Sequence, residues 1–143
     1  GEQVPVKVLF DTNVILDVLQ NRQPHAQAAT QLVARIERKE ITGYVCATTI
    51  TTIFYLASKA IGAETAKAKI KLLLELFEVT QVDKTVLLSA MQAGFSDFED
   101  AVLYKAAQHS SVDCIVTRNI KDFKQSKLPV YLPAELEAIL ELR

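Results

Sequence analysis

The sequence predicts a three-layer α/β/α domain around a mostly parallel sheet of about five strands. Short β-branched, apolar runs alternate with long amphipathic stretches, which is the pattern of strands joined by helical crossovers. The chain has 143 residues and half of them are apolar, which suits one domain with its own core. We therefore expect a single domain over residues 1–143, with a core over about 6–132 and a C-terminal helix over 134–142.

The expected strands are short and apolar. Val6–Phe10 is interrupted only by Lys7, which is typical of a strand covered on both faces. The last strand has a proline at each margin, so we expect it at an edge of the sheet. The five expected strands are Val6–Phe10, Tyr44–Ala47, Val79–Val82, Asp113–Thr117 and Pro129–Leu132.

Apolar residues recur at helical spacing between these strands. Gly43 is expected to end the helix before the second strand, because glycine commonly follows the last helical residue. The seven expected helices are Asn13–Leu19, His25–Lys39, Thr49–Lys59, Ala63–Phe77, Thr85–Gln92, Phe98–His109 and Ala134–Leu142.

Composition narrows the class of protein. No apolar run approaches the roughly 18 residues of a membrane helix, and no signal peptide precedes the first strand, so we expect a cytoplasmic protein. The formal net charge of −1 argues neither for nor against a nucleic-acid partner. Cys46 and Cys114 each lie in a short apolar run, and we expect both to be buried and reduced.

The predicted sheet indicates where a site would form. Ligands of such sheets bind beyond the carboxyl ends of the strands, near the point where strand order reverses. The residues that follow the first four strands are Asp11, Thr48–Thr52, Asp83 and Thr117–Asn119.

Acidic residues occur after the first strand and at the start of the helix that precedes the fourth strand. Asp11 directly follows the first strand, where it either caps the next helix or binds a ligand. Asp97 and Asp100 are three residues apart and share a face of the predicted helix. Ser96 and Glu99 have the spacing of a capping box, which accounts for Glu99 but not for the two aspartates.

Together, Asp11, Asp97 and Asp100 would form a site for a cation. Two carboxylates about 5 Å apart repel by roughly 3 kcal/mol at an effective dielectric near 20, so such a cluster binds protons or a cation. Oxygen ligands without histidine or cysteine favour Mg²⁺ or Mn²⁺. Asn119 and Asp122 supply further oxygen donors. Phosphodiester hydrolysis is the chemistry that suits this site.

Basic residues follow the fourth strand. Arg118, Lys121, Lys124 and Lys127 fall within ten residues. They form either a solvated face or, if they border the acidic site, a surface that binds the phosphates of a nucleic acid.

Three blocks of the chain resemble the PIN-domain family. They are Val8–Asp17, Phe98–Ala101 and Ile115–Asn119, the last followed by Asp122 and Phe123. The order and spacing match over about residues 6–132. The resemblance implies a ribonuclease that uses Mg²⁺ or Mn²⁺. It also implies kinship with the VapC-type toxins of toxin–antitoxin pairs, and hence RNA as substrate, an antitoxin as partner and a homodimer.

The resemblance also implies roles for particular residues. Asp11 matches the first metal-binding acid of the family, Asp100 the third, and Asp97 an additional acid three residues earlier. Thr117 matches the threonine that closes the fourth strand and supports the site, and Asn13 stands beside Asp11 in the same opening block.

Two departures from the family pattern matter. The second acid is normally a glutamate in the helix after the second strand, and Thr52 is the best positional match here. The fourth acid is replaced by Asn119, so either Asp122 compensates or Asn119 ligates through its carbonyl oxygen. These departures keep open an alternative, a catalytically weakened PIN-like module that binds RNA or protein.

A phosphoryl-transfer domain of another α/β class is a weaker alternative. Asp11-Thr12-Asn13-Val14 is near the opening of haloacid dehalogenase-like phosphatases, but Asn13 cannot be the acid that those enzymes need. A response-regulator receiver normally has paired acids at the end of its first strand, and the residue before Asp11 is Phe10.

Overall fold

Five parallel strands form the sheet of this computed structural model, which describes residues 4–143. The strands are β1 (Val6–Phe10), β2 (Ile41–Cys46), β3 (Glu78–Thr80), β4 (Cys114–Val116) and β5 (Val130–Tyr131). Their order is β3-β2-β1-β4-β5, and every neighbouring pair is parallel. The predicted fold class is confirmed, and β5 lies at an edge as expected. Residues 1–3 of the expected domain lie outside the described residues.

Helices connect the strands and cover both faces of the sheet. The helices are α1 (Thr12–Leu19), α2 (Ala26–Glu37), α3 (Ala47–Ile61), α4 (Ala63–Leu76), α5 (Lys84–Met91), α6 (Phe98–His109) and α7 (Pro133–Glu141). A 3₁₀-helix that was not expected, η1, spans Ile120–Phe123. Within residues 4–143, no helix combines the length and the apolar character needed to cross a bilayer.

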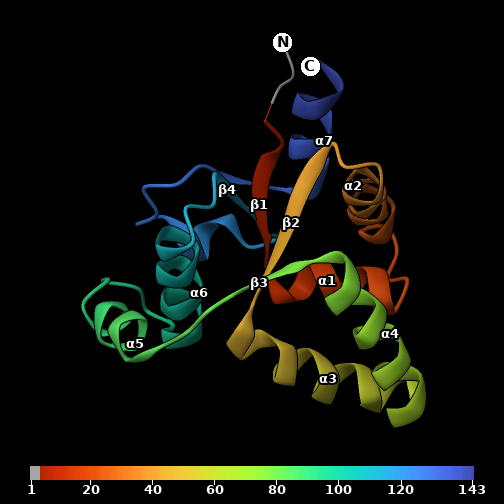
Figure 1. Cartoon of the computed structure of the whole chain (residues 1–143), viewed down its shortest axis with the longest axis horizontal. Helices are drawn as coiled ribbons and strands as arrows, with labels where there is room; N and C mark the ends of the chain where they lie inside the picture. Colours follow the sequence, from red (N-terminus) through yellow and green to blue (C-terminus); the bar gives the residue numbers. More distant parts are fainter. Residues whose placement is uncertain (1–3) are drawn as a thin grey trace.

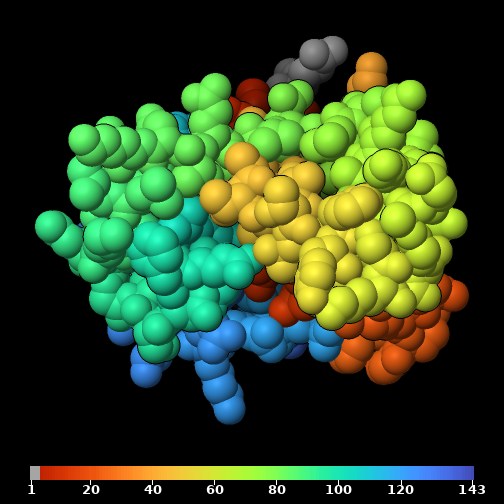
Figure 2. Space-filling view, turned by 90° about the horizontal axis from the view of Figure 1, so that it is seen from below, coloured from red at the N-terminus to blue at the C-terminus, as the bar shows by residue number. Residues whose placement is uncertain are grey.

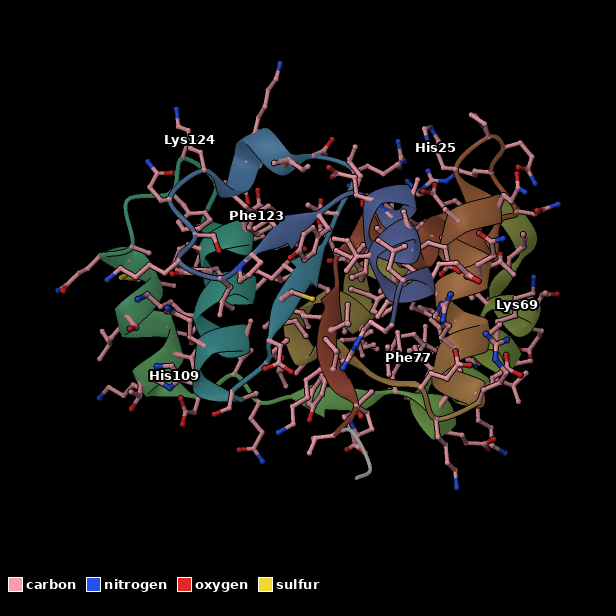
Figure 3. All side chains as sticks on the ribbon, turned by 90° about the horizontal axis from the view of Figure 1, so that it is seen from above. His25, Lys69, Phe77, His109, Phe123 and Lys124 are labelled. Carbon is pink, nitrogen blue, oxygen red and sulfur yellow. The ribbon has the colours of Figure 1, made fainter. Side chains whose placement is uncertain are left out.

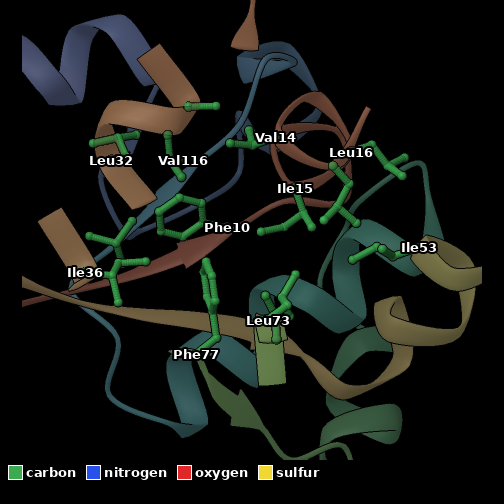
Figure 4. Close-up of a cluster of buried hydrophobic side chains, with 14 of the residues drawn as sticks. Phe10, Val14, Ile15, Leu16, Leu32, Ile36, Ile53, Leu73, Phe77 and Val116 are labelled. Atoms are coloured by element: carbon green, nitrogen blue, oxygen red, sulfur yellow. The ribbon is translucent and has the colours of Figure 1, made fainter. Parts of the chain in front are cut away.

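The two faces of the sheet carry different helices (Figure 1). Val8 and Phe10 of β1 point into a core made with α1, α2, α3, α4 and α7. Leu9, between them, points into a second core made with α5 and α6. Figure 4 shows the first core, in which the rings of Phe10 and Phe77 meet edge to face with centroids 5.2 Å apart. Alternate side chains of β1 therefore anchor both layers.

Gly43 corrects the expected boundary between α2 and β2. The helix ends at Glu37, and Gly43 lies inside β2, paired with Val8 of β1. A Cβ atom at Gly43 would overlap Ile36 Cδ1 and lie 2.9 Å from Phe77 Cδ2. Glycine is therefore needed here because a neighbouring helix and Phe77 approach the strand closely.

The cysteines behave as predicted. Cys46 ends β2 and Cys114 begins β4, and both are buried free thiols. They belong to different cores, Cys46 to the one beneath α6 and Cys114 to the one beneath α1 and α2.

Strand order reverses between β1 and β4. The chain runs from β1 outward to β2 and β3, then returns to place β4 on the other side of β1. Phe10 pairs with Val116, and the N–H of Asp11 donates to the carbonyl of Val116 at 3.0 Å. Asp11 and Thr117 thus emerge together at the carboxyl end of the sheet, where sites of such folds form. In Figure 1 this end lies on the side of α3, away from both termini.

Candidate active site

Asp11 is held at the end of β1 by two hydrogen bonds to its carboxylate. Oδ1 accepts from the N–H of Thr12 at 2.8 Å, which caps α1, and Oδ2 accepts from the hydroxyl of Thr117 at 2.7 Å. The side chain is nearly buried, with 7% of the residue exposed. Asp11 therefore caps α1, which is one of its two expected roles, and the same side chain lines the cleft described below.

Burial raises the pKa of Asp11 above its usual value. The hydrogen bonds from Thr117 and from Thr12 N–H act in the opposite direction, because both favour the ionised form. The negative charges of Asp122 and Asp97 raise the pKa again. The carboxylate of Asp11 thus lies among other acids that it repels.

The first turn of α6 brings three more acids to the same place. Asp97 caps the helix, and its Oδ1 accepts from the N–H of Asp100 at 2.9 Å. The predicted capping box of Ser96 and Glu99 is therefore wrong, because Asp97 and not Ser96 caps the helix, although the helix spans Phe98–His109 as expected. Glu99 is left free of that task, and its side chain lines the cleft beside Asp11 and Asp100.

Burial also raises the pKa of Asp100, to about 7. The charges of Asp11, Asp97, Asp122 and Glu99 act in the same direction, in that order. The pKa of Glu99 is raised by burial and then by Asp97 and Asp11. Acids that perturb one another in this way are typical of functional sites.

These side chains line one open cleft of about 310 Å³. Figure 2 looks onto it and shows a hollow floored by the red of the N-terminal segment, between the teal of α6, the gold of α3 and the blue chain after β4. The residues that line it are Asp11, Thr12, Asn13, Leu16, Arg22, Thr52, Leu56, Asp97, Glu99, Asp100, Leu103, Arg118 and Asn119. The cleft brings together most of the residues that the sequence singles out.

Thr117 is buried next to this cleft and forms hydrogen bonds with two of its lining residues, Asp11 and Asn119. It is fully buried, donates its hydroxyl proton to Asp11, and accepts from the N–H of Asn119 at 3.0 Å. Asn13 accepts with its side-chain oxygen from the N–H of Arg118 at 3.4 Å. The turn after β4 is therefore tied to the turn after β1 by side chains from both.

Thr52 is the residue through which α3 reaches the cleft, followed one turn later by Leu56. Thr52, the residue that the resemblance matches to the family's second acid, therefore lines the same cleft as the acids. On this side of the cleft, α3 contributes the hydroxyl of Thr52 and the aliphatic side chain of Leu56, and no carboxylate. The acids of the cleft come instead from the end of β1 and the start of α6.

Besides Thr117, three predicted residues do not line the cleft. Asp122 is exposed on η1, yet its charge raises the pKa of both Asp11 and Asp100, so it lies near the acids. Lys121 and Lys124 are exposed, and in Figure 3 the side chain of Lys124 points away from the molecule while Phe123 lies inside it. Of the expected basic residues, Arg118 alone contributes to the cleft lining.

The donors of the cleft suit a hard cation that keeps part of its water shell. They are carboxylate, amide and hydroxyl oxygens, with no histidine or cysteine among them. Among residues 4–143, no three Asp, Glu, His or Cys side chains converge into a ready-made cage. Mg²⁺ is usually held by one or two carboxylates and several waters. The oxygen donors of the cleft therefore fit Mg²⁺ better than an ion that is bound entirely by protein ligands.

Sequence reasoning missed two charged residues of the cleft, Glu99 and Arg22. The spacing of Glu99 from Ser96 indicates a capping box, and because serine and aspartate are both good caps, the sequence does not distinguish Ser96 from Asp97. Arg22 lies in the turn after α1, where no periodicity marks it. Its proximity to Asp17, five residues earlier, is the only hint in the sequence.

Known proteins resemble the chain over most of its length. Residues 7–121 match the family model described as PIN domain. Ribonuclease VapC1 of Aquifex aeolicus (strain VF5) is 26% identical over 134 residues, which cover 90% of this chain and 92% of that protein. VapBC2 from Rickettsia felis, solved bound to a DNA fragment from its promoter, has a TM-score of 0.67 at 17% identity, covering 86% of this chain and 96% of its own. Mycobacterium tuberculosis VapC20, a sarcin-ricin loop cleaving toxin, has a TM-score of 0.62 at 15% identity, covering 76% of this chain and 86% of its own.

Proposed function

The chain belongs to the PIN-domain family, and on that premise we propose that it is a divalent-metal-dependent endoribonuclease that hydrolyses RNA phosphodiester bonds. We propose further that it acts as the toxin of a toxin–antitoxin pair. Asp11, Asp97 and Asp100 are the catalytic acids of this proposal, and Mg²⁺ or Mn²⁺ is the cofactor. The relative named Ribonuclease VapC1 supports the activity, because it covers nine-tenths of the chain.

One observation carries the proposal: the carboxylate of Asp11 is fixed at the strand-order reversal, in the same cleft as Asp97 and Asp100. Metal ligands also include Asn119 and Asp122 in this proposal. Thr117, Asn13 and Thr52 support them. If Asp11 served only to cap α1, nothing would require Asp97 and Asp100 to lie in the same cleft.

A divalent ion in the cleft would lower the pKa of a bound water and neutralise charge that builds on the phosphate. The residues of the chain have separate tasks around it. Thr117 and the Thr12 N–H fix the orientation of Asp11 at the cleft, and each carboxylate oxygen keeps a lone pair for a ligand. Burial and the neighbouring acids raise the pKa of Asp100 to about 7, so a divalent ion would compete with a proton for this carboxylate near neutral pH.

Basic residues near the cleft would hold the RNA backbone. Arg118 is the residue at the cleft wall, and Lys121 and Lys124 extend the same basic segment outward. Phosphate contacts of this kind position a strand without reading its sequence.

A second candidate function follows from α3. Thr52 places a hydroxyl where the family normally has a glutamate, so the cleft holds less charge to bind a cation. The chain would then be a catalytically weakened module that binds RNA or protein. The two functions differ in one measurable property, metal-dependent cleavage.

The partners and setting belong to the same proposal. Structural neighbours include VapBC2 of Rickettsia felis and a toxin–antitoxin complex from Klebsiella pneumoniae, which support an antitoxin as protein partner. We extend the proposal to a homodimer and to the cytoplasm, where an RNA substrate is available.

Cleavage of a labelled RNA in Mn²⁺, Mg²⁺ or EDTA tests the function. We expect cleavage with either ion and none in EDTA. Asp11→Asn should lower the rate by at least about a hundredfold, the loss typical when a group that acts on the transition state is removed. Asp113→Asn is the matched control, because Asp113 accepts from the N–H of Lys7 at the opposite end of β1.

Calorimetric titration with Mn²⁺ separates the two candidate functions. A nuclease should bind Mn²⁺ and lose that binding in Asp11→Asn. Mn²⁺ binding or RNA binding without any cleavage in the wild type would favour the non-catalytic module. Cleavage that persists unchanged in Asp11→Asn would reject this cleft as the active site.

A further inference from the structure

Asp17 is a fully buried carboxylate that the proposed chemistry does not use. It lies on α1, six residues after Asp11, and none of it is exposed. A buried charge is costly unless it is paired. Asp17 is paired twice, with arginines from two separate parts of the chain.

Both arginines approach Asp17 closely. Arg22 Nε lies 2.9 Å from Oδ1, and Arg118 Nε lies 2.8 Å from Oδ2. These two contacts are ion pairs without hydrogen-bond geometry, whereas Arg118 Nη2 donates a hydrogen bond to Oδ1 at 3.3 Å, so Arg118 lies against both oxygens of the carboxylate. Arg22 comes from the turn after α1, and Arg118 follows β4.

Further bonds fix the direction of each arginine. Arg22 Nη2 donates to the carbonyl of Asn13 at 3.3 Å, and the Arg22 N–H donates to the carbonyl of Asp17 at 3.0 Å. The N–H of Arg118 donates to the side chain of Asn13 at 3.4 Å. Asn13 and Asp17 together hold both guanidinium groups in place.

One carboxylate balances one of the two cations, so this cluster carries a net positive charge. Both arginine side chains remain partly open to solvent, 38% for Arg22 and 28% for Arg118. Both line the acidic cleft. Within residues 4–143, every ion pair of Arg22 and Arg118 is made with Asp17 and none with the acids of the cleft. Neither Nη1 has a protein acceptor in the described part of the chain.

We propose that Arg22 and Arg118 form a phosphate-binding site on the wall of the cleft, and that Asp17 is the positioning residue that holds them there. The ligand is a phosphate of the RNA strand next to the bond that is cut, so the inference rests on the proposed function and deepens it. Guanidinium groups bind phosphate oxygens through paired donors, and their orientation decides how well they do so. An RNA strand offers a row of phosphates, so one can meet the arginines while its neighbour faces the acids.

Fluorescence anisotropy with a labelled single-stranded RNA in EDTA tests the site without any cleavage. The repulsion between RNA and the acids is common to all variants, so it cancels in the comparison. We expect Arg22→Gln and Arg118→Gln each to weaken binding about tenfold at low salt. Each should also reduce the slope of log affinity against log salt by about 0.7, the value for one phosphate contact on a single strand.

Arg38→Gln is the matched control, because Arg38 is an exposed arginine paired with Glu40 at the opposite end of the sheet. It removes the same charge and should change affinity much less. Arg22→Lys keeps the charge but loses the planar fork, so it should restore the salt slope while leaving binding weaker than in the wild type.

Asp17→Asn separates positioning from charge. The substitution makes the protein more positive by one unit, so an effect of net charge alone would tighten RNA binding. Release of the two arginines from their anchor should weaken it instead. Tighter binding in a folded Asp17→Asn variant would reject the positioning role.

The phosphate site would be overturned if Arg22→Gln and Arg118→Gln both kept the affinity and the salt slope of the wild type. It would also be overturned if the arginines bound an acidic protein segment and not RNA. Because the assay contains no metal, its result is independent of the nuclease proposal. Loss of RNA binding in these variants of a protein that never cleaves RNA would support the site while rejecting the nuclease.

Discussion

At the scale of single residues, the two carboxylate oxygens of Asp11 have separate hydrogen-bond partners. Oδ1 receives the N–H of Thr12 and Oδ2 the hydroxyl of Thr117. Each carboxylate oxygen has two lone pairs, so each keeps one for a ligand in the cleft. Capping and ligation are therefore compatible here. The hydroxyl of Thr117 matters more than its methyl group, because it is the donor that a buried carboxylate requires.

Thr117→Val tests whether Asp11 depends on the hydroxyl of Thr117. The substitution preserves the shape of the side chain and removes the donor, which leaves a buried oxygen of Asp11 short of a partner. We expect a loss of about 1–3 kcal/mol in the free energy of unfolding at pH 7, measured by urea titration. We also expect weaker Mn²⁺ binding by calorimetry.

Thr117→Ser is the matched control, since it keeps the hydroxyl and loses only the methyl group. Its Mn²⁺ affinity should stay near that of the wild type. Equal losses of Mn²⁺ affinity in the valine and serine variants would mean that Thr117 acts by packing and not by orienting Asp11.

At the scale of helices and strands, the way each element ends decides what the cleft contains. Asp11 directly follows β1 and caps α1, and Asp97 directly precedes α6 and caps it. Sequence patterns predict these positions well, because a buried strand followed by polar residues and an amphipathic helix that begins with acids are both distinctive. The pairing of β4 with β1 follows from the usual order of such sheets.

Other features of the elements escape the sequence for definite reasons. Gly43 has the appearance of a helix stop, and only the tertiary approach of Ile36 and Phe77 explains its place inside β2. Arg22 lies in a turn without periodicity, and its place at the cleft depends on its ion pair with the buried Asp17. Such contacts depend on the distance between elements, which residue spacing along the chain does not encode.

Gly43→Ala tests the close approach at β2. The added methyl group would overlap Ile36 Cδ1, so we expect a loss of about 1–3 kcal/mol in the free energy of unfolding. Ile36→Val removes that same Cδ1 atom and should relieve the overlap. The double variant should therefore be more stable than the sum of the two single losses predicts, as a double-mutant cycle in urea measures. Additive losses would show that the overlap is absorbed elsewhere.

At the scale of the whole molecule, the net charge is only −1, but negative and positive side chains line different parts of the cleft. Asp11, Asp97, Glu99 and Asp100 line one part of the cleft, while Arg22 and Arg118 line another. Composition could not predict this arrangement, because it arises from segments that are about eighty to a hundred residues apart joining at one end of the sheet. Repulsion among the acids of the cleft should lower the stability of the folded protein by an amount that depends on pH and on whether a cation is bound.

The metal-free protein should lose stability as pH rises from about 4 to above 7. The folded protein holds a proton on Asp100 with a pKa of about 7, whereas the unfolded chain releases it near the ordinary aspartate value of about 4. Over that interval the unfolded state loses its proton first, so rising pH favours unfolding. The raised pKa values of Asp11 and Glu99 act with the same sign. Asp100 is half-buried, so after allowance for solvent screening we expect a loss of about 1–2 kcal/mol from it.

Thermal unfolding in EDTA between pH 4 and pH 8 measures this effect, and Asp100→Asn isolates it. The variant carries no titrating group at that position, so its melting temperature should fall less with pH and exceed that of the wild type by a few degrees at pH 8. Mn²⁺ should raise the melting temperature of the wild type at pH 8, because an ion bound only by the folded state stabilises it by mass action. The same ion should have little effect on Asp100→Asn. A wild type that gains stability between pH 5 and pH 8 in EDTA would contradict the account, since the cluster would then favour its ionised form without a cation.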